Sequence, residues 1–285
     1  GALSPAKTIS VDLQSASSQP SGEAGPVPLR IGVAAMISPK ITYTYYEKLL
    51  KRAGEILGRR VEIVQRKSYQ EMNDLLNRRE IDMAFVCAGP YVTGHDQFGM
   101  ELLVAPVSHG KQVYHSYIIV REDSGIRSVD DLRGRTFAYT DPDSNSGCLA
   151  PRHLLAGRGQ TPGTFFGRCF YSYSHDNSIQ AVIKGTADGA AVDSIIWEFA
   201  KDLDPSLASQ IKIVWQSPAY GIPPIVVHPN VAETEKERLR HLLLHLHEDE
   251  SARRFMQELR IDRFDRTTDT NYESVRQMLR EIPIK

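Results

Sequence analysis

Residues 81–91 read Ile81-Asp-Met-Ala-Phe-Val-Cys-Ala-Gly-Pro-Tyr91, and residues 141–151 read Asp141-Pro-Asp-Ser-Asn-Ser-Gly-Cys-Leu-Ala-Pro151. Each stretch has the pattern of a strand that ends in a turn of small residues and passes into a helix. In open α/β sheets, ligands bind at the carboxyl ends of the strands. We therefore expect the two turns to face each other across one cleft, with Cys87 at the first of them.

The residues around the first stretch predict a β-α-β-α-β unit. Short apolar runs predict strands at 29–35, 61–65 and 83–86, and apolar residues at helical spacing predict a helix over 43–57. Ser68-Tyr-Gln-Glu71 has the pattern of a capping box that opens a second helix, ending near Arg79. Strands that alternate with helices imply a parallel sheet with right-handed crossovers.

The same alternation recurs around the second stretch, and two segments join the halves. One joining segment precedes the strand at 114–121, and the other is the proline-rich run 217–224, which suits an extended connection. We predict an α/β fold of two lobes, each a mostly parallel sheet flanked by helices. Residues 29–108 and 222–285 form lobe 1, residues 109–221 form lobe 2, and the two crossovers form a hinge that permits closure. The remaining strands are expected at 101–107, 136–139, 169–173, 189–192, 211–216 and 225–228, and the remaining helices at 128–131, 149–156, 177–184, 194–201, from 234, at 251–259 and from 270.

The composition excludes some classes of function. The 285 residues include 34 Lys and Arg against 35 Asp and Glu, a formal net charge of −1, so no electrostatic footprint for nucleic acid is present. No apolar run is long enough to span a bilayer, and we expect no direct membrane insertion. Residues 1–28 are rich in Ser, Ala, Gly and Pro, which favours a linker or stalk. No signal peptide is visible, which fits either a cytoplasmic protein or the mature form of an exported one.

Three cysteines occur, an odd number. In an oxidising compartment two of them can pair. Cys148 and Cys169 both fall in lobe 2, whereas Cys87 falls in lobe 1, so we predict a disulfide between Cys148 and Cys169 and a thiol at Cys87. The alternative, three unpaired thiols in a cytoplasmic protein, stays open at this point.

Five motifs follow one another along the chain. They are Asp82-Met-Ala-Phe-Val86 with Gly89-Pro-Tyr91, Asp141 to Gly147, Ser174-His-Asp176, Gly185-Thr-Ala-Asp-Gly-Ala190, and Val192-Asp-Ser194. Taken in this order, they resemble the phosphonate-type periplasmic substrate-binding proteins, a family of two-lobed solute receptors. The resemblance runs from Leu29 to the C-terminus. It implies a type II-like periplasmic binding protein fold, a periplasmic location, ligand binding without catalysis and no cofactor.

The resemblance also implies a set of ligand-binding residues. The family's second turn usually reads Asp-Pro-x-Ser-Thr-Ser-Gly, and Asn145 replaces the Thr here. Hydroxyls and amides of this turn cap a helix and hold the ligand's oxygens, while carboxylates accept from protonated ligand oxygens. Helix capping alone, or a place in the core, is the alternative role for each of these residues. The implied set is Ala88, Tyr43, Tyr114, His115, Ser144, Asn145, Ser146, Gly147, His175, Asp176 and Asp193, in addition to Cys87.

Cys87 departs from the family, which usually has Gly or a similarly small residue there. Thiolates select soft, thiophilic elements, and this combination resembles the family's arsenite-binding branch. Members of that branch act with a membrane sensor histidine kinase that switches on arsenite oxidation. The resemblance therefore implies arsenous acid as ligand, with one As–S bond to Cys87. The alternatives are that Cys87 is a small buried hydrophobe at a strand end, and that Cys148 supplies a second sulfur.

Two rival functions remain. A transport receptor for phosphonate, phosphite or a phosphate-like oxyanion, which docks on an ABC permease, shares the fold and differs at Cys87. A cysteine enzyme would use Cys87 with His175 or His115, but it needs a base within hydrogen-bond reach and an oxyanion hole. The sequence has no motif with the spacing of either, so we expect a binding protein rather than an enzyme.

Overall fold

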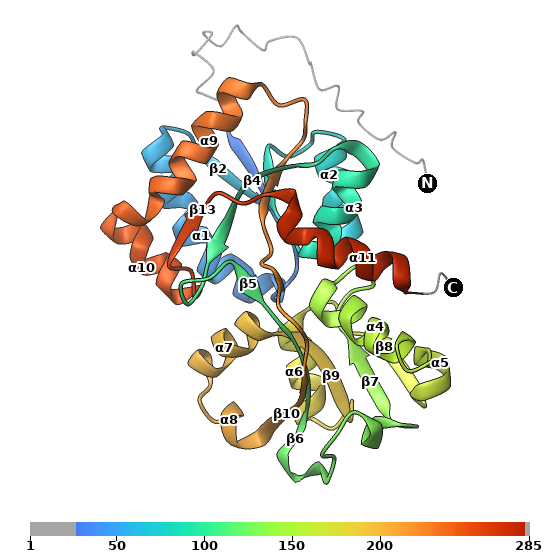
Figure 1. Ribbon diagram of the computed structural model, residues 1–285. Helices are drawn as coiled ribbons and strands as arrows, with labels where there is room; N and C mark the ends of the chain where they lie inside the picture. Colours follow the sequence, from blue (N-terminus) through green and yellow to red (C-terminus); the bar gives the residue numbers. More distant parts are fainter. Residues whose placement is uncertain (1–26, 283–285) are drawn as a thin grey trace, which may run out of the picture.

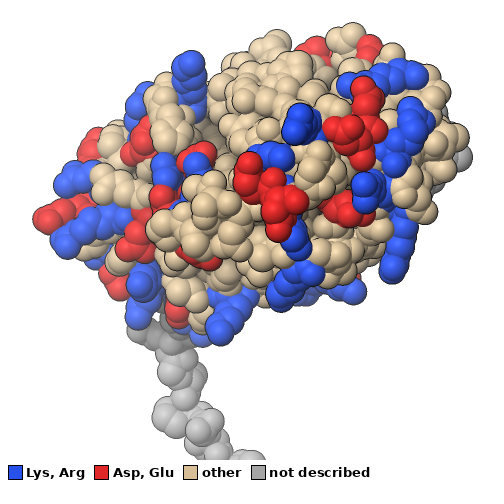
Figure 2. All heavy atoms as spheres, turned by 90° about the horizontal axis from the view of Figure 1, so that it is seen from below, with Lys and Arg blue, Asp and Glu red and all other residues tan. Residues whose placement is uncertain are grey.

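Two β-sheets form the cores of two lobes in the computed structural model, which describes residues 27–282 (Figure 1). The expected linker at 1–28 lies almost entirely outside the described residues. Within 27–282, no helix combines the length and the apolarity that crossing a membrane requires. On the face that Figure 2 shows, Lys and Arg side chains alternate with Asp and Glu, without a continuous area of one sign.

The sheet of lobe 1 has the strand order β13-β4-β12-β3-β1-β2. Strands β2, β1, β3 and β4 share one direction, and β12 and β13 run against them. Helices cover both of its faces. The strands are β1 (Leu29–Val33), β2 (Val61–Val64), β3 (Met83–Phe85), β4 (Glu101–Val107), β12 (Ile225–Val227) and β13 (Arg263–Asp265), and the helices are α1 (Pro39–Leu57), α2 (Tyr69–Asn77), α3 (Ala88–Phe98), α9 (Glu233–His245), η4 (Leu246–Glu248), α10 (Glu250–Glu258), η5 (Asp269–Tyr272) and α11 (Glu273–Glu281).

The sheet of lobe 2 has the order β10-β6-β9-β7-β8. Only β6 runs against the other four strands, so the prediction of two mostly parallel sheets is confirmed. The strands are β6 (Ser116–Arg121), β7 (Thr136–Tyr139), β8 (Arg168–Tyr171), β9 (Gly189–Asp193) and β10 (Ile211–Gln216), and the helices are η1 (Glu122–Ser124), η2 (Asp130–Leu132), the π-helical turn η3 (Asn145–Leu149), α4 (Ala150–Ala156), α5 (Pro162–Phe165), α6 (His175–Ile183), α7 (Ser194–Leu203) and α8 (Leu207–Gln210).

The hinge consists of two crossovers that pair with each other. Strand β5 (Val113–Tyr114) and strand β11 (Tyr220–Gly221) form a short antiparallel ribbon between the lobes (Figure 1). The N–H of Ile222 donates to the carbonyl of Gln112 at 3.1 Å, which extends this pairing. Because the two connections are hydrogen-bonded together, the lobes share one hinge rather than two independent links.

Strand β3 shows how the core places the functional turn. Along β3 and the residue that follows it, side chains alternate between two clusters. Met83 and Phe85 pack on the side of α1, and Ala84 and Val86 pack on the side of α2 and α3. A strand buried on both faces requires an uninterrupted apolar run. The next residue, Cys87, is therefore the first that can face the opposite lobe at the carboxyl edge of the sheet.

Candidate functional site

Cys87 lies where the two lobes touch. It is the N-cap of α3 and is 1% exposed. Its sulfur lies 3.9 Å from the Tyr114 hydroxyl of the hinge, and the backbone N–H groups of Gly89 and of Asn145 in lobe 2 hydrogen-bond to it. Burial raises the pKa of the Cys87 thiol to about 11, so the sulfur is a neutral thiol near pH 7.

In the turn at 144–147, some polar groups bond within the turn and others are directed toward the opposite lobe. The Ser144 hydroxyl accepts from the N–H of Gly147 at 3.0 Å. A Cβ atom on Gly147 would lie 2.3 Å from Thr140 Oγ1, so only glycine fits there. Asn145 donates from Nδ2 to the Tyr114 hydroxyl at 2.9 Å, and its Oδ1 has no partner, like the hydroxyl of Ser146.

His175 presents a neutral N–H donor. The N–H of Asp193 donates to His175 Nδ1 at 3.1 Å, so the ring proton resides on Nε2. The Nε2 atom is buried and has no partner. Complete burial lowers the pKa of His175 to about 3, so the imidazole stays uncharged near neutral pH.

Asp193 ends β9 and caps α7. Its Oδ1 accepts from the N–H groups of Ile195 and Ile196, at 2.7 and 3.1 Å. Burial raises the pKa of the carboxyl group to about 7, although these two hydrogen bonds oppose the shift. Near pH 7 the Asp193 carboxyl is therefore divided between its protonated and ionised forms.

Tyr69 belongs to the same cluster and was missed by the sequence analysis. It is the first residue of α2 and is 1% exposed. Burial, followed by the charges of Cys87, Asp141 and Asp193, raises the pKa of its hydroxyl, and the side chain of Ser144 opposes this shift. No hydrogen bond of normal geometry reaches the hydroxyl. The capping box at Ser68 marks α2 as starting at the carboxyl edge of the sheet, and this signal could have identified Tyr69.

Unpartnered buried atoms concentrate around Cys87 and Asp193. Among the described residues, nine buried side-chain nitrogen or oxygen atoms have no partner, and four of them are at this cluster. Buried polar atoms are nearly always hydrogen-bonded, so such a concentration indicates the place of a small polar ligand. The pKa values of Cys87, Asp193 and Tyr69 are shifted most by burial. The four atoms are Tyr69 Oη, Asn145 Oδ1, Ser146 Oγ and His175 Nε2.

Other expected site residues bond to the protein at the lobe boundary. His115 lies in the hinge, where its Nδ1 is 2.9 Å from the carbonyl of Ser217. Asp176 accepts from the N–H of Ser38, in lobe 1, at 2.7 Å. Ala88 is buried at the start of α3. In the described part of the chain, no group of three or more His, Cys, Asp or Glu residues is placed to hold a metal ion.

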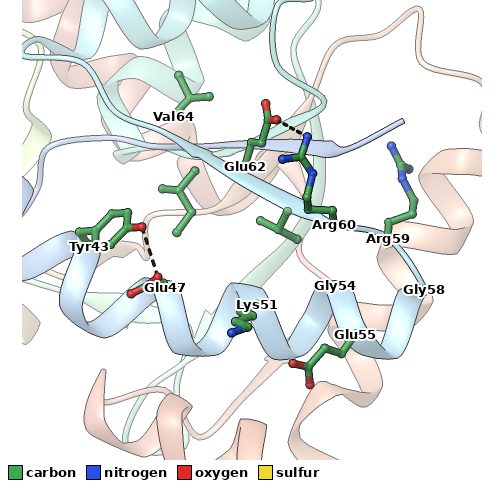
Figure 3. A pocket seen from close by; sticks show the side chains of 12 residues that line it. Tyr43, Glu47, Lys51, Gly54, Glu55, Gly58, Arg59, Arg60, Glu62 and Val64 are labelled. Carbon is green, nitrogen blue, oxygen red and sulfur yellow. Dashed lines mark hydrogen bonds and ion pairs between the residues drawn. The ribbon is translucent and has the colours of Figure 1, made fainter. Parts of the chain in front are cut away.

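Tyr43 is not in the cleft, and its predicted role is wrong. The residue is 49% exposed, and its hydroxyl donates to Glu47 at 3.2 Å. It lines a groove between α1 and β2 on the outside of lobe 1 (Figure 3). The packed face of α1 carries Thr42, Tyr46 and Leu49, and residue 43 lies beside that face, toward solvent.

The predicted disulfide is also absent, because Cys148 and Cys169 are not joined in the structure. Cys148 is buried in the lobe 2 core with Phe137 and Tyr139, whereas Cys169 is exposed on β8. Cys87 belongs to a different cluster. Cys148 therefore does not serve as a second sulfur at the site, since the π-helical turn directs residue 148 into the core.

Comparison with known proteins identifies the family. A profile described as the ABC transporter, phosphonate, periplasmic substrate-binding protein matches residues 31–272. The chain belongs to this family.

Among curated relatives of this phosphonate-binding family, the chain is 25% identical over 173 residues to the phosphonates-binding periplasmic protein of Escherichia coli, covering 59% of this chain and 51% of that one. It is 30% identical over 98 residues to the probable ABC transporter phosphite binding protein PhnD1 of Prochlorococcus marinus, covering 34% and 33%. The chain thus matches about half or less of each relative's length.

Solved structures confirm the two-lobed α/β periplasmic binding protein fold. A binding protein component of an ABC phosphonate transporter from Pseudomonas aeruginosa has a TM-score of 0.83 at 24% identity, covering 88% of this chain and 85% of that one. PhnD1 from Prochlorococcus marinus in complex with methylphosphonate has a TM-score of 0.80 at 18% identity, covering 89% and 97%. These relatives are named as binding proteins, in keeping with the expectation that the chain is not an enzyme. The arsenite-binding branch stays a prediction.

Proposed function

We propose that this member of the phosphonate-binding family is a periplasmic receptor that binds arsenous acid through Cys87. The observation that carries the proposal is the position of the Cys87 sulfur, at the contact between the lobes and beside the unpartnered polar atoms. Soft sulfur ligands select thiophilic elements, of which trivalent arsenic is one.

The binding step conserves charge. The Cys87 sulfur forms a bond to arsenic, one As–O bond breaks, and the thiol proton leaves with the departing hydroxide as water. Because the thiol is protonated near pH 7 and arsenous acid is neutral there, no charge has to be buried. The two remaining hydroxyls donate to Asn145 Oδ1 and accept from His175 Nε2, while Tyr69 and Ser146 complete their hydrogen bonds.

The same features oppose catalysis at Cys87. A nucleophilic cysteine is normally activated by a lowered pKa, whereas burial raises the pKa of Cys87. The Nδ1 atom of His175 is already used by the N–H of Asp193. We therefore propose reversible binding without turnover.

A second candidate ligand is phosphite or an alkylphosphonate, and the family comparisons favour it. The relatives are named for phosphonates and phosphite, and one solved relative holds methylphosphonate. Such a ligand would use the hydrogen-bonding groups without a bond to sulfur. Its partner would be an ABC permease, whereas an arsenous acid receptor would signal to the sensor domain of a membrane histidine kinase.

Calorimetric titration separates the two candidates. Wild type, Cys87→Ser and the matched control Cys169→Ser, an exposed cysteine, are each titrated with arsenite, phosphite and methylphosphonate. We expect arsenite binding in wild type and Cys169→Ser, and its loss in Cys87→Ser by about 100-fold or more, which is ~2.7 kcal/mol. Arsenite affinity that survives in Cys87→Ser, or tight phosphonate binding in all three proteins without arsenite binding, contradicts the arsenic proposal.

A further inference from the structure

Three helices of lobe 1 begin at the cleft, and lobe 2 supplies a carboxylate to two of them. Asp176 Oδ1 accepts from the N–H of Ser38, directly before α1, at 2.7 Å. Asp141 Oδ2 accepts from the N–H of Tyr69, at the start of α2, at 3.0 Å. A helix start carries unpaired N–H groups and the positive end of the helix dipole, so a carboxylate there is favourable. The third helix, α3, begins at Cys87 and faces the ligand site.

We propose that Asp141 and Asp176 are positioning residues, which hold lobe 2 closed against α1 and α2 while the start of α3 is left for the ligand. This inference rests on the proposed function as a receptor with a ligand in the cleft, whichever oxyacid that ligand is. Each carboxylate accepts from a backbone N–H of the opposite lobe, so the proposal assigns both residues to closure, and for Asp176 this replaces the expected role in ligand binding.

Close approach of the lobes at α3 supports this arrangement. A Cβ atom on Gly89 would lie 2.3 Å from the carbonyl oxygen of Asp143 and 3.5 Å from the backbone nitrogen of Asn145, so the lobes meet there at backbone distance. The N–H of His175 also donates to the carbonyl of Met36 across the boundary, at 2.9 Å. These contacts join residues of different lobes and exist only when the cleft is closed.

Asp141 and Asp176 differ in what else they bind. Asp141 is almost fully buried, and its Oδ1 accepts from the N–H of Asp143, so it also shapes the turn that carries Asn145. The carboxylate of Asp176 is half-buried, and its described hydrogen bond goes to Ser38. A substitution at Asp176 therefore tests closure of the lobes without also disturbing the turn at 144–147.

Loss of either bond lowers the fraction of protein in the closed form. When only the closed form binds fully, the apparent dissociation constant equals the intrinsic constant divided by that fraction. A carboxylate at a partly buried helix start contributes enough to change the closed-to-open ratio by about three- to ten-fold. The ligand's own contacts stay intact, so maximal occupancy at saturating ligand is unchanged.

The test compares Asp176→Ala with Asp188→Ala as a matched control. Asp188 also accepts from a backbone N–H, that of Thr136 at 2.9 Å, but both residues are in lobe 2. Spin labels on the two lobes report the distance between them, with and without ligand, and calorimetry with arsenite and with phosphite reports affinity. We expect Asp176→Ala to bind ligand about three- to ten-fold more weakly and to populate longer interlobe distances. Asp188→Ala should match wild type in both measurements. Asp176→Asn should recover part of the lost affinity, because its amide oxygen can accept the hydrogen bond from Ser38.

A double-mutant cycle makes the test specific. Ser38→Pro removes the N–H that Asp176 binds, and the φ of −56° at Ser38 suits proline. Ser38→Pro should add nothing to the loss in Asp176→Ala; additive losses, or unchanged distances and affinity in Asp176→Ala, overturn the inference. If neither arsenite nor phosphite binds wild type, the proposed ligands fail, while the ligand-free distances in Asp176→Ala still decide whether the carboxylate holds the lobes together.

Discussion

Cys87 acquires its proposed role from its neighbours rather than from acidity. Burial keeps the thiol protonated, and the N–H groups of Gly89 and Asn145 aim at the sulfur from both lobes. A neutral thiol suits condensation with a neutral acid, in which water leaves and no ion is buried. The same environment would slow attack on substrates that require a thiolate.

The hydroxyl of Tyr114 contacts both Cys87 and Asn145 of lobe 2, so removing this hydroxyl should lower the stability of the protein and its affinity for ligand. Tyr114→Phe leaves Asn145 Nδ2 buried without its acceptor, which we expect to lower the free energy of unfolding by about 1–3 kcal/mol and to weaken ligand binding. Urea denaturation and titration measure the two effects. Tyr43→Phe, at the exposed site outside the cleft, is the control and should change neither; equal behaviour of the two variants would refute the role of Tyr114.

Asp193 should make stability depend on pH. Its pKa rises from 3.8 to about 7 on burial, so the folded chain keeps a proton between those values that the unfolded chain has released. The free energy of unfolding therefore falls as pH rises through this window. Asp193→Asn keeps a capping side chain without titrating.

We expect the stability of wild type, measured relative to Asp193→Asn, to decrease by at most about 4 kcal/mol between pH 4 and pH 7. Denaturant unfolding of both proteins over this range gives the difference directly, and other titrating groups cancel in it. A difference that stays flat with pH shows that Asp193 is ionised throughout.

The pattern of a strand end followed by small residues predicted where the two turns lie, with Cys87 at the first of them. Asn145, Ser146, His175 and Asp193 were named as site residues from the resemblance to the family, and in the structure they lie in the same cluster as Cys87. Tyr43 was implied by the resemblance to the family, but it lies on α1 with its side chain toward solvent, and the local sequence does not encode how α1 is oriented relative to the cleft. Tyr69 was missed because an aromatic residue at a helix start has the same pattern as a core residue until the opposite lobe is placed.

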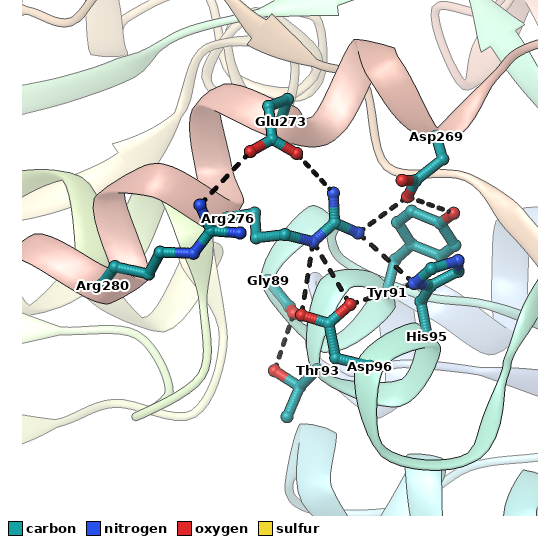
Figure 4. A network of polar contacts seen from close by, with 9 residues as sticks. All are labelled: Gly89, Tyr91, Thr93, His95, Asp96, Asp269, Glu273, Arg276 and Arg280. Atoms are coloured by element: carbon teal, nitrogen blue, oxygen red, sulfur yellow. Dashed lines mark hydrogen bonds and ion pairs between the residues drawn. The ribbon is translucent and has the colours of Figure 1, made fainter.

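At the scale of elements, α11 ties the helix that carries Cys87 to lobe 2. Arg276 of α11 has a side chain 9% exposed and binds Asp96 of α3 at 3.2 Å, Asp269 of η5 at 2.8 Å and Glu273 at 2.8 Å (Figure 4). The far end of α11 reaches α4, where His153 Nε2 lies 2.6 Å from Glu281. The helix therefore contacts both lobes beside the hinge.

Arg276→Met should loosen this junction. Three carboxylates lose their shared partner, but they are half-exposed and screened by water, so we expect a decrease of about 1–2 kcal/mol in the free energy of unfolding. Arg254→Met is the matched control, because Arg254 makes an exposed i,i+4 ion pair with Glu250, and should cost less than about 0.5 kcal/mol. A loss at Arg276 no larger than at Arg254 would show that the network adds no stability.

Elements were predictable where local signals are strong. Buried runs such as 29–33 and 189–193 and the capping box at Ser68 predict their strands and helix closely. The short strand β13 and the π-helical turn η3 were not predicted. Pairing with β4, about 160 residues earlier in the chain, defines β13. The turn η3 requires Gly147 to pack tightly against Thr140 at the end of β7, a tertiary contact that residue propensities do not encode.

At the scale of the whole molecule, the sequence predicted two lobes joined by two crossovers. It did not predict that the two crossovers pair with each other through β5 and β11. Strands β6 and β12 each follow a crossover and run against most of their sheet. Their direction is set by the chain re-entering a lobe from the hinge. This geometry makes closure a rotation about one ribbon, β5 with β11.

Ligand binding should therefore compact the molecule. Small-angle scattering of the ligand-free protein should show a larger radius of gyration than that of the protein saturated with ligand, because only the closed form joins both sets of contacts. Asp176→Ala should shift the ligand-free value further upward. A radius of gyration that does not change on saturation with a ligand shown to bind would contradict closure.

The most direct measurement of the central claim is the X-ray absorption spectrum, at the arsenic edge, of the protein loaded with one equivalent of arsenite. The account predicts one sulfur neighbour and two oxygen neighbours at arsenic in wild type, and no sulfur neighbour in Cys87→Ser. Arsenic surrounded only by oxygen in wild type, or by sulfur that persists in Cys87→Ser, would contradict it.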